Sequence, residues 1–160
     1  MGMGDTREKL AWCVVDVSNW RDAYAMQPRE DQRAFVAPNA YSLLEGIYTP
    51  NLTSVLAYEA DVPVAYALYG DDPDAPGSEP VWLLRFFVAA DHQRRGIGRR
   101  ALGSLLERIE MENPGRPLRL GVVEDNTVAR RLYERFGFID TGEMGGREVI
   151  YERPRRRTAS

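Results

Sequence analysis

The sequence predicts a single α/β domain in which helices flank a mixed central sheet. Three observations support this fold class. Residues 81–88 (VWLLRFFV) are apolar except for one arginine, which is typical of a central strand covered on both faces. Apolar residues then recur at helical spacing from residue 97 onward. Strand-like and helix-like segments alternate through the rest of the chain, as in α/β domains.

The N-terminal part predicts a strand and then helical segments. Residues 10–17 form an apolar run typical of a strand. Ser18 is placed to cap a helix over residues 19–26. Residues 28–48 are ambiguous, because two prolines interrupt their helical pieces.

A hairpin and a loop precede the central strand. Residues 53–60 and 62–69 predict two strands that turn at Asp61, and side chains of the second arm alternate in character. Residues 70–80 (GDDPDAPGSEP) are rich in glycine and proline and predict a loop.

Two amphipathic helices and three strands complete the pattern. The helices are expected from residue 97 and around residues 129–136, where Gly137 stops the second one. The strands are expected at 118–123, 138–143 and 147–152. The predicted order is therefore β-α-α-β-β-β-α-β-α-β-β.

Composition fits one domain in a reducing compartment. The chain has 160 residues, 44% of them apolar, and these suffice for one core. We expect an ordered domain over residues 9–153, disorder in 1–8 and a basic disordered tail over 154–160. No run of 18 apolar residues occurs, and the first ten residues lack the apolar stretch of a signal peptide. We therefore expect a cytoplasmic protein that does not contact a membrane.

The net charge and the few metal-ligating residue types limit which partners are expected. One cysteine and one histidine cannot form a Cys/His metal cluster, so no metal is expected. A net charge of -3 argues against a nucleic-acid partner. Residues 10–90 carry eleven acids against four arginines, whereas residues 91–152 carry eleven of each. The anionic front half favours a cationic ligand.

The first motif is a glycine-containing turn between the central strand and the following helix. Glycine lets the backbone approach a ligand closely, and free N–H groups at a helix start attract anions. A phosphate or pyrophosphate fits such a site, and a plain turn beside a solvated charged face is the alternative. The spacing differs from that of triphosphate and dinucleotide loops. The residues expected in the site are Gln93, Arg94, Arg95, Gly96, Ile97, Gly98 and Arg99.

A second motif follows the next strand and reads Asn126-x-x-Ala129-x-x-Leu132-Tyr133-x-x-x-Gly137-Phe138. With both motifs present, the sequence resembles the GNAT N-acetyltransferase superfamily. The Q-x-x-G-x-G turn is similar to the family's acetyl-CoA pyrophosphate loop, and the second motif to its second cofactor segment. The motifs occur in the family's order, and the resemblance covers roughly residues 10–152.

The resemblance implies a GNAT fold whose mixed sheet is splayed between its fourth and fifth strands. The pantetheine arm of acetyl-CoA would enter this gap and pair with backbone groups at about Phe87 and Val88. Asn126 would lie near the arm, and the small Ala129 would leave room for it. A backbone N–H near Val88 would stabilise the oxyanion of the reacting thioester.

Tyr133 is implied as the general acid that protonates the departing thiolate. The residue pattern by itself leaves another interpretation open. Tyr133 shares an apolar helix face with Ala129, Leu132 and Phe136, which is also typical of a core aromatic residue.

Two segments resemble bacterial spermine/spermidine acetyltransferases and, less closely, diamine acetyltransferases. They are residues 36–45 (VAPNAYSLLE) and 81–88. Together with the acid excess of the front half, this resemblance favours a polyamine such as spermidine or spermine as the small-molecule amine.

The expected substrate residues come from three segments. Glu45 is the leading ammonium-binding carboxylate, with a solvated helix face as its alternative. Tyr41 and Trp20 could flank a cation or an alkyl chain. Arg85 would lie near the amine or pair with an acid such as Glu45.

The chain departs from the family where a general base is expected. Diamine acetyltransferases carry an acid just before the paired phenylalanines, where this chain has Leu84 and Arg85. Protein N-terminal acetyltransferases carry a glutamate five residues before the motif asparagine, where this chain has Gly121. The nearby Glu124 fits a strand end better, so we expect water or an unassigned carboxylate to remove the proton.

Other functions remain open at this point. The acceptor could be an aminoglycoside, an amino acid or a protein amine. A non-catalytic acyl-CoA-binding regulatory module is the alternative from another class, although Tyr133 argues against it, because a binder needs no proton donor at the sulfur. The resemblance also implies a homodimer, since GNAT proteins of this size often associate through their C-terminal strands.

Overall fold

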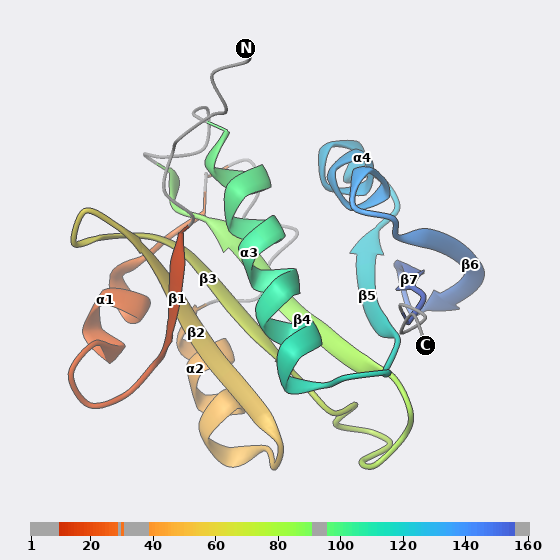
Figure 1. Ribbon diagram of the computed structural model, residues 1–160, viewed down its shortest axis with the longest axis horizontal. Coiled ribbons are helices and arrows are strands. Elements are labelled where there is room, and N and C mark those ends of the chain that lie inside the picture. Colours follow the sequence, from red (N-terminus) through yellow and green to blue (C-terminus); the bar gives the residue numbers. More distant parts are fainter. Residues whose placement is uncertain (1–9, 29, 31–38, 91–95, 156–160) are drawn as a thin grey trace.

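The protein is built on a seven-stranded mixed sheet in the order β1-β2-β3-β4-β5-β7-β6 (Figure 1). The structure is a computed structural model that describes residues 10–28, 30, 39–90 and 96–155. Its elements are β1 (Ala11–Val14), α1 (Trp20–Ala25), α2 (Asn39–Tyr48), β2 (Leu52–Glu59), β3 (Val62–Gly70), β4 (Val81–Val88), α3 (Ile97–Glu112), β5 (Leu118–Val123), α4 (Thr127–Arg135), β6 (Ile139–Gly145) and β7 (Glu148–Arg153). The predicted fold class and element order are confirmed.

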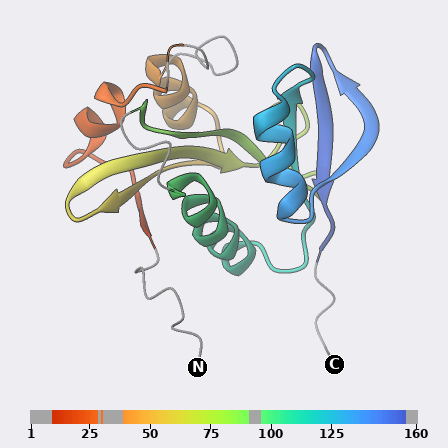
Figure 2. The ribbon, with the colours of Figure 1, turned by 90° about the horizontal axis from the view of Figure 1, so that it is seen from above.

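Helices cover both faces of the sheet. Figure 2 shows α1 and α2 on one face and α3 on the other. The larger core lies on the α3 side, where residues of α4 such as Leu132 and Tyr133 also pack. A smaller core lies under α1 and α2 and includes Tyr66 and Phe87. Strands β2, β3 and β4 therefore contribute side chains to both cores.

The β2–β3 hairpin turns where the sequence predicts it. Ala60 and Asp61 adopt positive φ angles of 47° and 67°. Two consecutive left-handed residues are the requirement of the two-residue turns that match strand twist. The turn joins β2 and β3, which lie between β1 and β4 in the sheet.

The first strand and helix are shorter than predicted. Strand β1 ends at Val14, and α1 begins after Asn19, so Ser18 is not the helix cap. The backbone N–H and the hydroxyl of Ser18 both donate to the Asp16 carboxylate, at 2.8 and 2.6 Å. Because Asp16 closes this turn, the chain leaves the sheet earlier than the apolar run suggests.

The ambiguous region after α1 resolves into one helix. Within the described part of residues 28–48, α2 begins at Asn39, whose side-chain amide donates to the carbonyls of Ala23 and Met26 at 2.6 and 2.5 Å. A buried amide thus fastens α2 to the C-terminal end of α1. Residues 31–38 lie outside the described part of the chain.

Strands β4 and β5 touch only at their beginnings. Their parallel pairing consists of Val81 with Leu118 and Trp82 with Arg119. Beyond these pairs the two strands diverge, and β4 continues beside β3 while β5 continues beside β7 (Figure 1). The predicted splay between the fourth and fifth strands is confirmed.

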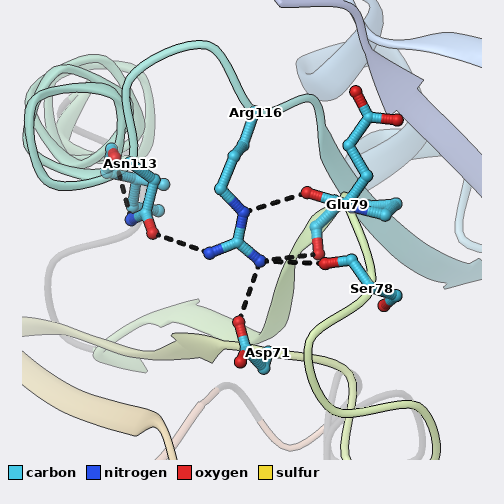
Figure 3. Close-up of polar contacts among 7 residues, drawn as sticks. Asp71, Ser78, Glu79, Asn113 and Arg116 are labelled. Carbon is cyan, nitrogen blue, oxygen red and sulfur yellow. Dashed lines mark hydrogen bonds and ion pairs between the residues drawn. The ribbon is translucent and has the colours of Figure 1, made fainter.

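The Arg116 guanidinium fastens the closed end of this splay (Figure 3). It donates to the Asp71 carboxylate at 2.8 Å and to the Asn113 side-chain oxygen at 3.1 Å. It also reaches three carbonyls of the loop before β4, those of Ser78, Glu79 and Pro80. One side chain therefore ties the β3–β4 loop to the connection between α3 and β5.

We expect Arg116→Ala to destabilise the fold, because it leaves a half-buried carboxylate and several carbonyls without their charged donor. The loss should be about 2–3 kcal/mol, or a fall of about 5–10 °C in melting temperature. Arg155→Ala is the matched control, since the polar contact of Arg155 within the described residues is an exposed 3.6 Å ion pair with Glu79. Equal melting temperatures for the two variants would contradict the role of Arg116.

Candidate active site

A cavity of about 200 Å³ lies where β4 and β5 diverge. Residues of both strands, the start of α4 and one residue of β7 line it. They are Leu83, Leu84, Arg85, Phe86, Leu120, Gly121, Val122, Val123, Asn126, Ala129, Tyr133 and Glu148. Four of the residues expected in the site, Arg85, Asn126, Ala129 and Tyr133, are therefore brought together here.

Helix α4 presents Ala129 and Tyr133 to the cavity, and its start is fixed by the preceding Asn126. The Asn126 side-chain oxygen accepts a hydrogen bond from the Ala129 backbone N–H at 3.3 Å, which satisfies one free donor of the first turn. Ala129 and Tyr133 follow at intervals of three and four residues, so they share one helix face. That face borders the cavity.

Tyr133 is buried and lines the cavity. The residue is 8% exposed, and its ring meets Phe138 edge-on with 5.6 Å between centroids. No hydrogen bond of the hydroxyl occurs within the described residues. Burial, followed by the charge of Glu148, raises the Tyr133 pKa, so the phenol stays protonated and can donate. The ring is thus a core aromatic, while its hydroxyl remains available for chemistry.

The start of α3 has the geometry of an anion site. Gly96 is the residue before the helix and adopts the left-handed conformation, with φ of 71°. A Cβ at Gly98 would lie 3.8 Å from a Val88 methyl group, an ordinary contact distance. The first N–H groups of the sixteen-residue helix therefore lie next to the end of β4.

The remaining residues expected at the cofactor differ in placement. Arg99 is exposed, whereas the Ile97 side chain is fully buried in the core, leaving only its backbone near the helix start. Phe87 and Val88 are buried at the end of β4. The Phe87 ring packs against the Tyr66 ring, with 5.7 Å between the ring centroids. Gln93, Arg94 and Arg95 lie outside the described residues.

Arg85 reaches the cavity because of a bulge in β4. Leu68 pairs with Arg85 and Tyr69 with Leu83, so Leu84 is the extra residue. The Arg85 guanidinium lies 3.3 Å from the Glu45 carboxylate and donates to the Leu84 carbonyl at 2.7 Å. Its Nε is buried without a partner among the described residues.

The pairing of Arg85 with Glu45, raised as one alternative from the sequence, is therefore present. It joins α2 to β4 on the sheet face opposite α3. The buried Tyr66 hydroxyl lies 3.0 Å from the Ser54 hydroxyl. Burial raises the Tyr66 pKa, and the charges of Arg85 and Glu45 also act on this group.

Tyr41 and Trp20 are not brought to this cavity. Tyr41 is 60% exposed on α2. Trp20 is 42% exposed, and the Arg21 guanidinium covers its ring at 4.5 Å. Trp20 lines a separate, larger hollow of about 800 Å³ between α1, α2, β1 and β2. That hollow is mostly apolar and shares no residue with the cavity between β4 and β5.

Sequence reasoning missed Glu148. It opens β7, lines the cavity and lies beside Gly121 of the neighbouring strand. Its spacing in the sequence carries no sign of this, because the contact depends on how β7 pairs with β5. The signal that could have found it is the predicted C-terminal hairpin, docked in register against the strand at 118–123.

Comparison with known proteins decides the family. The sequence model of the acetyltransferase (GNAT) family matches residues 14–138. The chain belongs to this family. The GNAT chain is also 36% identical over 92 residues to the spermine/spermidine N(1)-acetyltransferase of Bacillus subtilis. That match covers 56% of this chain and 60% of the relative's length.

Solved structures share the fold of this GNAT protein. An aminoglycoside acetyltransferase, AAC(6')-Ib, in complex with paromomycin and acetyl-CoA, has a TM-score of 0.76 at 15% identity and covers 92% of this chain and 94% of its own. The ribosomal-protein-S18-alanine N-acetyltransferase of Escherichia coli has a TM-score of 0.69 at 21% identity, with coverages of 94% and 96%. At these identities the likeness concerns the fold.

Two features are absent from the described residues, a membrane-spanning helix and a metal-binding cluster. None of their helices is long and apolar enough to cross a bilayer. No group of three or more His, Cys, Asp or Glu side chains among them could hold a metal ion.

We expect Gly98→Asp to weaken acetyl-CoA binding more than about 100-fold, because a carboxylate at the helix start would face the pyrophosphate. The fold should persist, since a Cβ fits at this position. Calorimetric titration with acetyl-CoA measures the effect. Met111→Asp adds the same charge to an exposed position at the other end of α3 and should bind normally. Unchanged affinity in a folded Gly98→Asp protein would refute the site.

Proposed function

We propose that this protein transfers the acetyl group of acetyl-CoA to a primary amine by direct attack in a ternary complex. The observation that carries the proposal is the Tyr133 hydroxyl. It is held protonated, without a partner in the described residues, at the cavity between β4 and β5. A purely structural tyrosine would gain from a hydrogen bond at this depth. A non-catalytic acyl-CoA-binding module would have no use for a proton donor there.

The residues around the splay fit acetyl-CoA. The N–H groups at the start of α3 suit the pyrophosphate, and the lack of a side chain at Gly98 lets the backbone approach it. Backbone groups at Phe87 and Val88 would pair with the pantetheine arm. Asn126 and Ala129 line the opposite wall of the gap. Acetyl-CoA supplies an activated acyl carbon, and the protein orients it between the two strands.

Tyr133 then has one defined task. When the amine nitrogen bonds to the acyl carbon, the carbon–sulfur bond breaks and the thiolate needs a proton. The Tyr133 hydroxyl donates it as general acid. Its raised pKa favours the protonated form at neutral pH, which is the form the reaction requires.

A polyamine is the acceptor that the observations favour. The similar Bacillus subtilis protein is named for spermine and spermidine. The acid excess of residues 10–90 is the chain's own contribution, because it attracts a polycation toward the sheet. The Glu45 carboxylate is shared with Arg85, so an arriving ammonium group would have to compete for it.

One observation favours a second candidate. The buried Arg85 Nε has no partner among the described residues, and the guanidinium lines the cavity. A donor of this kind suits an acceptor amine that also carries a carboxylate or another anionic group, as an amino acid does.

We expect Tyr133→Phe to lower kcat by about 10²–10⁴-fold, because it deletes the proton donor and keeps the ring. Acetyl-CoA affinity and melting temperature should stay nearly unchanged, since the hydroxyl has no hydrogen bond within the described residues to lose. Steady-state thiol release measures kcat. Tyr48→Phe, on an exposed ring, is the control. A Tyr133→Phe enzyme that keeps more than about half of its kcat would exclude the acid role.

We expect kcat/KM for spermidine or spermine to exceed that for a monoamine of similar length. The difference should shrink as salt is raised, because screening weakens the attraction between exposed charges. A panel that includes amino acids and an aminoglycoside measures thiol release for each class. Equal values for monoamine and polyamine would argue against a polyamine site, and a preference for amino acids would favour the second candidate.

A further inference from the structure

Among the described residues that line the cavity between β4 and β5, Glu148 carries the one carboxylate. We propose that Glu148, on the adjacent strand β7, is the general base that takes the proton from the acceptor amine. The inference rests on the proposed acetyl transfer and identifies the residue that this function still lacks.

The geometry places the Glu148 carboxylate against Gly121. Strand β7 runs antiparallel to β5, with Glu148 opposite Val123 and Ile150 opposite Gly121. A Cβ built on Gly121 would overlap a Glu148 carboxylate oxygen and would lie 3.0 Å from Cδ and 3.2 Å from Cβ of Glu148. The Glu148 side chain therefore occupies the space into which a side chain at position 121 would grow.

This carboxylate lies on the acceptor side of the sheet. Leu120 and Val122 of β5 point into the core toward α3 and α4. Because side chains alternate along a strand, Gly121 faces the other way. The same holds for β7, where Val149 and Tyr151 enter that core and Glu148 does not. The amine would thus arrive from the face opposite the one that holds the anion site of α3.

The Glu148 charge acts on Tyr133 across the cavity. Both line the cavity, and the Glu148 charge adds to burial in raising the Tyr133 pKa. The effect has the sign that catalysis needs, since a nearby anion keeps the phenol protonated. One group is thereby ready to accept a proton and the other to donate one.

The other nearby carboxylates are less suited to this task. Glu45 is paired with Arg85. Glu124 is exposed and does not line the cavity, and its backbone carbonyl accepts from Arg130. Glu148 has no ion pair or side-chain hydrogen bond to any described residue. Its exposure in the structure leaves a path by which the accepted proton can reach water.

The proton balance of the reaction is complete with these two groups. An ammonium substrate gives one proton to a Glu148 carboxylate oxygen, and the freed lone pair forms the carbon–nitrogen bond. The carbon–sulfur bond breaks, and the thiolate takes the Tyr133 proton. The nitrogen then loses its second proton, which restores Tyr133, while Glu148 releases the first to solvent. One proton is liberated for each amide formed.

The test is Glu148→Gln, which keeps size and polarity but removes the base. With spermidine, or with the best ammonium substrate of the panel, kcat/KM at pH 7 should fall by about 10²-fold or more. With a primary amine already neutral at pH 7, such as aminoacetonitrile, the fall should be less than about 5-fold, because that amine has no ammonium proton to lose. Glu152→Gln, on the same face of β7 and paired with Arg119, is the matched control and should retain activity with both amines.

The pH profile supplies an independent readout. In the variant, kcat/KM for the ammonium substrate should keep rising toward the pKa of the amine, about 10, because only free amine reacts. Two charged or titratable groups face Glu148 among the described residues, Arg85 from β4 and Tyr133 from α4. Arg119 lies on the same face of β5, and it forms ion pairs with Glu143 and Glu152. The raised pKa of Tyr133 keeps its ionisation out of the neutral range.

Moving the carboxylate should rescue the reaction. Glu148→Gly removes every side-chain atom of Glu148 that would crowd a Cβ at position 121, and adding Gly121→Glu returns a carboxylate to the cavity from β5. The double variant should exceed Glu148→Gly by at least about 10-fold with the ammonium substrate.

Three outcomes would overturn the assignment alone: a Glu148→Gln enzyme that retains more than half of its kcat/KM, an equal loss with the neutral amine, or no rescue by a folded double variant. A wild-type protein that releases no CoA with any amine would overturn the proposed function, and the assignment with it.

Discussion

The short contact between β4 and β5 is the constraint on which the rest of the structure depends. Two residue pairs join the strands, and the pairing stops after Trp82. A parallel sheet gains from continuing such pairing, so the separation needs support from its surroundings. Arg116 provides that support at the closed end, where it binds both connections that meet there. The helices α3 and α4 then flank the open part.

This separation gives the site two distinct sides. On one side, α3 begins beside the end of β4, and the start of α4 at Asn126 borders the cavity. On the other side lie Arg85 with Glu45, and Glu148 beside Gly121. Tyr133 reaches the cavity from the first side. In the proposed reaction, the acyl donor and the amine approach from opposite faces and meet between the strands.

Local patterns predicted most of the fold. Strands 81–88 and 118–123 match the structure at both ends, because their apolar runs are bounded by clear turn signals. The start of α3 at Ile97 follows from a glycine that adopts a left-handed conformation. The Ser18 cap failed because the backbone N–H and the hydroxyl of Ser18 both donate to the Asp16 carboxylate. Short polar side chains offer such local hydrogen bonds as an alternative to helix capping.

The site was predictable where one segment carries it and less so where segments meet. Asn126, Ala129 and Tyr133 share a helix, so their spacing fixes their common face. No glycine or proline within residues 81–88 signals the bulge at Leu84, which turns Arg85 toward Glu45. Glu148 becomes relevant only through the pairing of two strands that are separated by a helix and a further strand.

The dependence of Glu148 on strand pairing makes its position a property of register. A slip of β7 by one residue would turn Glu148 toward the core and bring an apolar neighbour to the cavity, because side chains on a strand alternate. The backbone pairing of β5 with β7 spans six residue pairs, from Leu118 with Arg153 to Val123 with Glu148. These pairs fix the position of the Glu148 carboxylate. Residues far from the cavity therefore help to determine which side chain lines it.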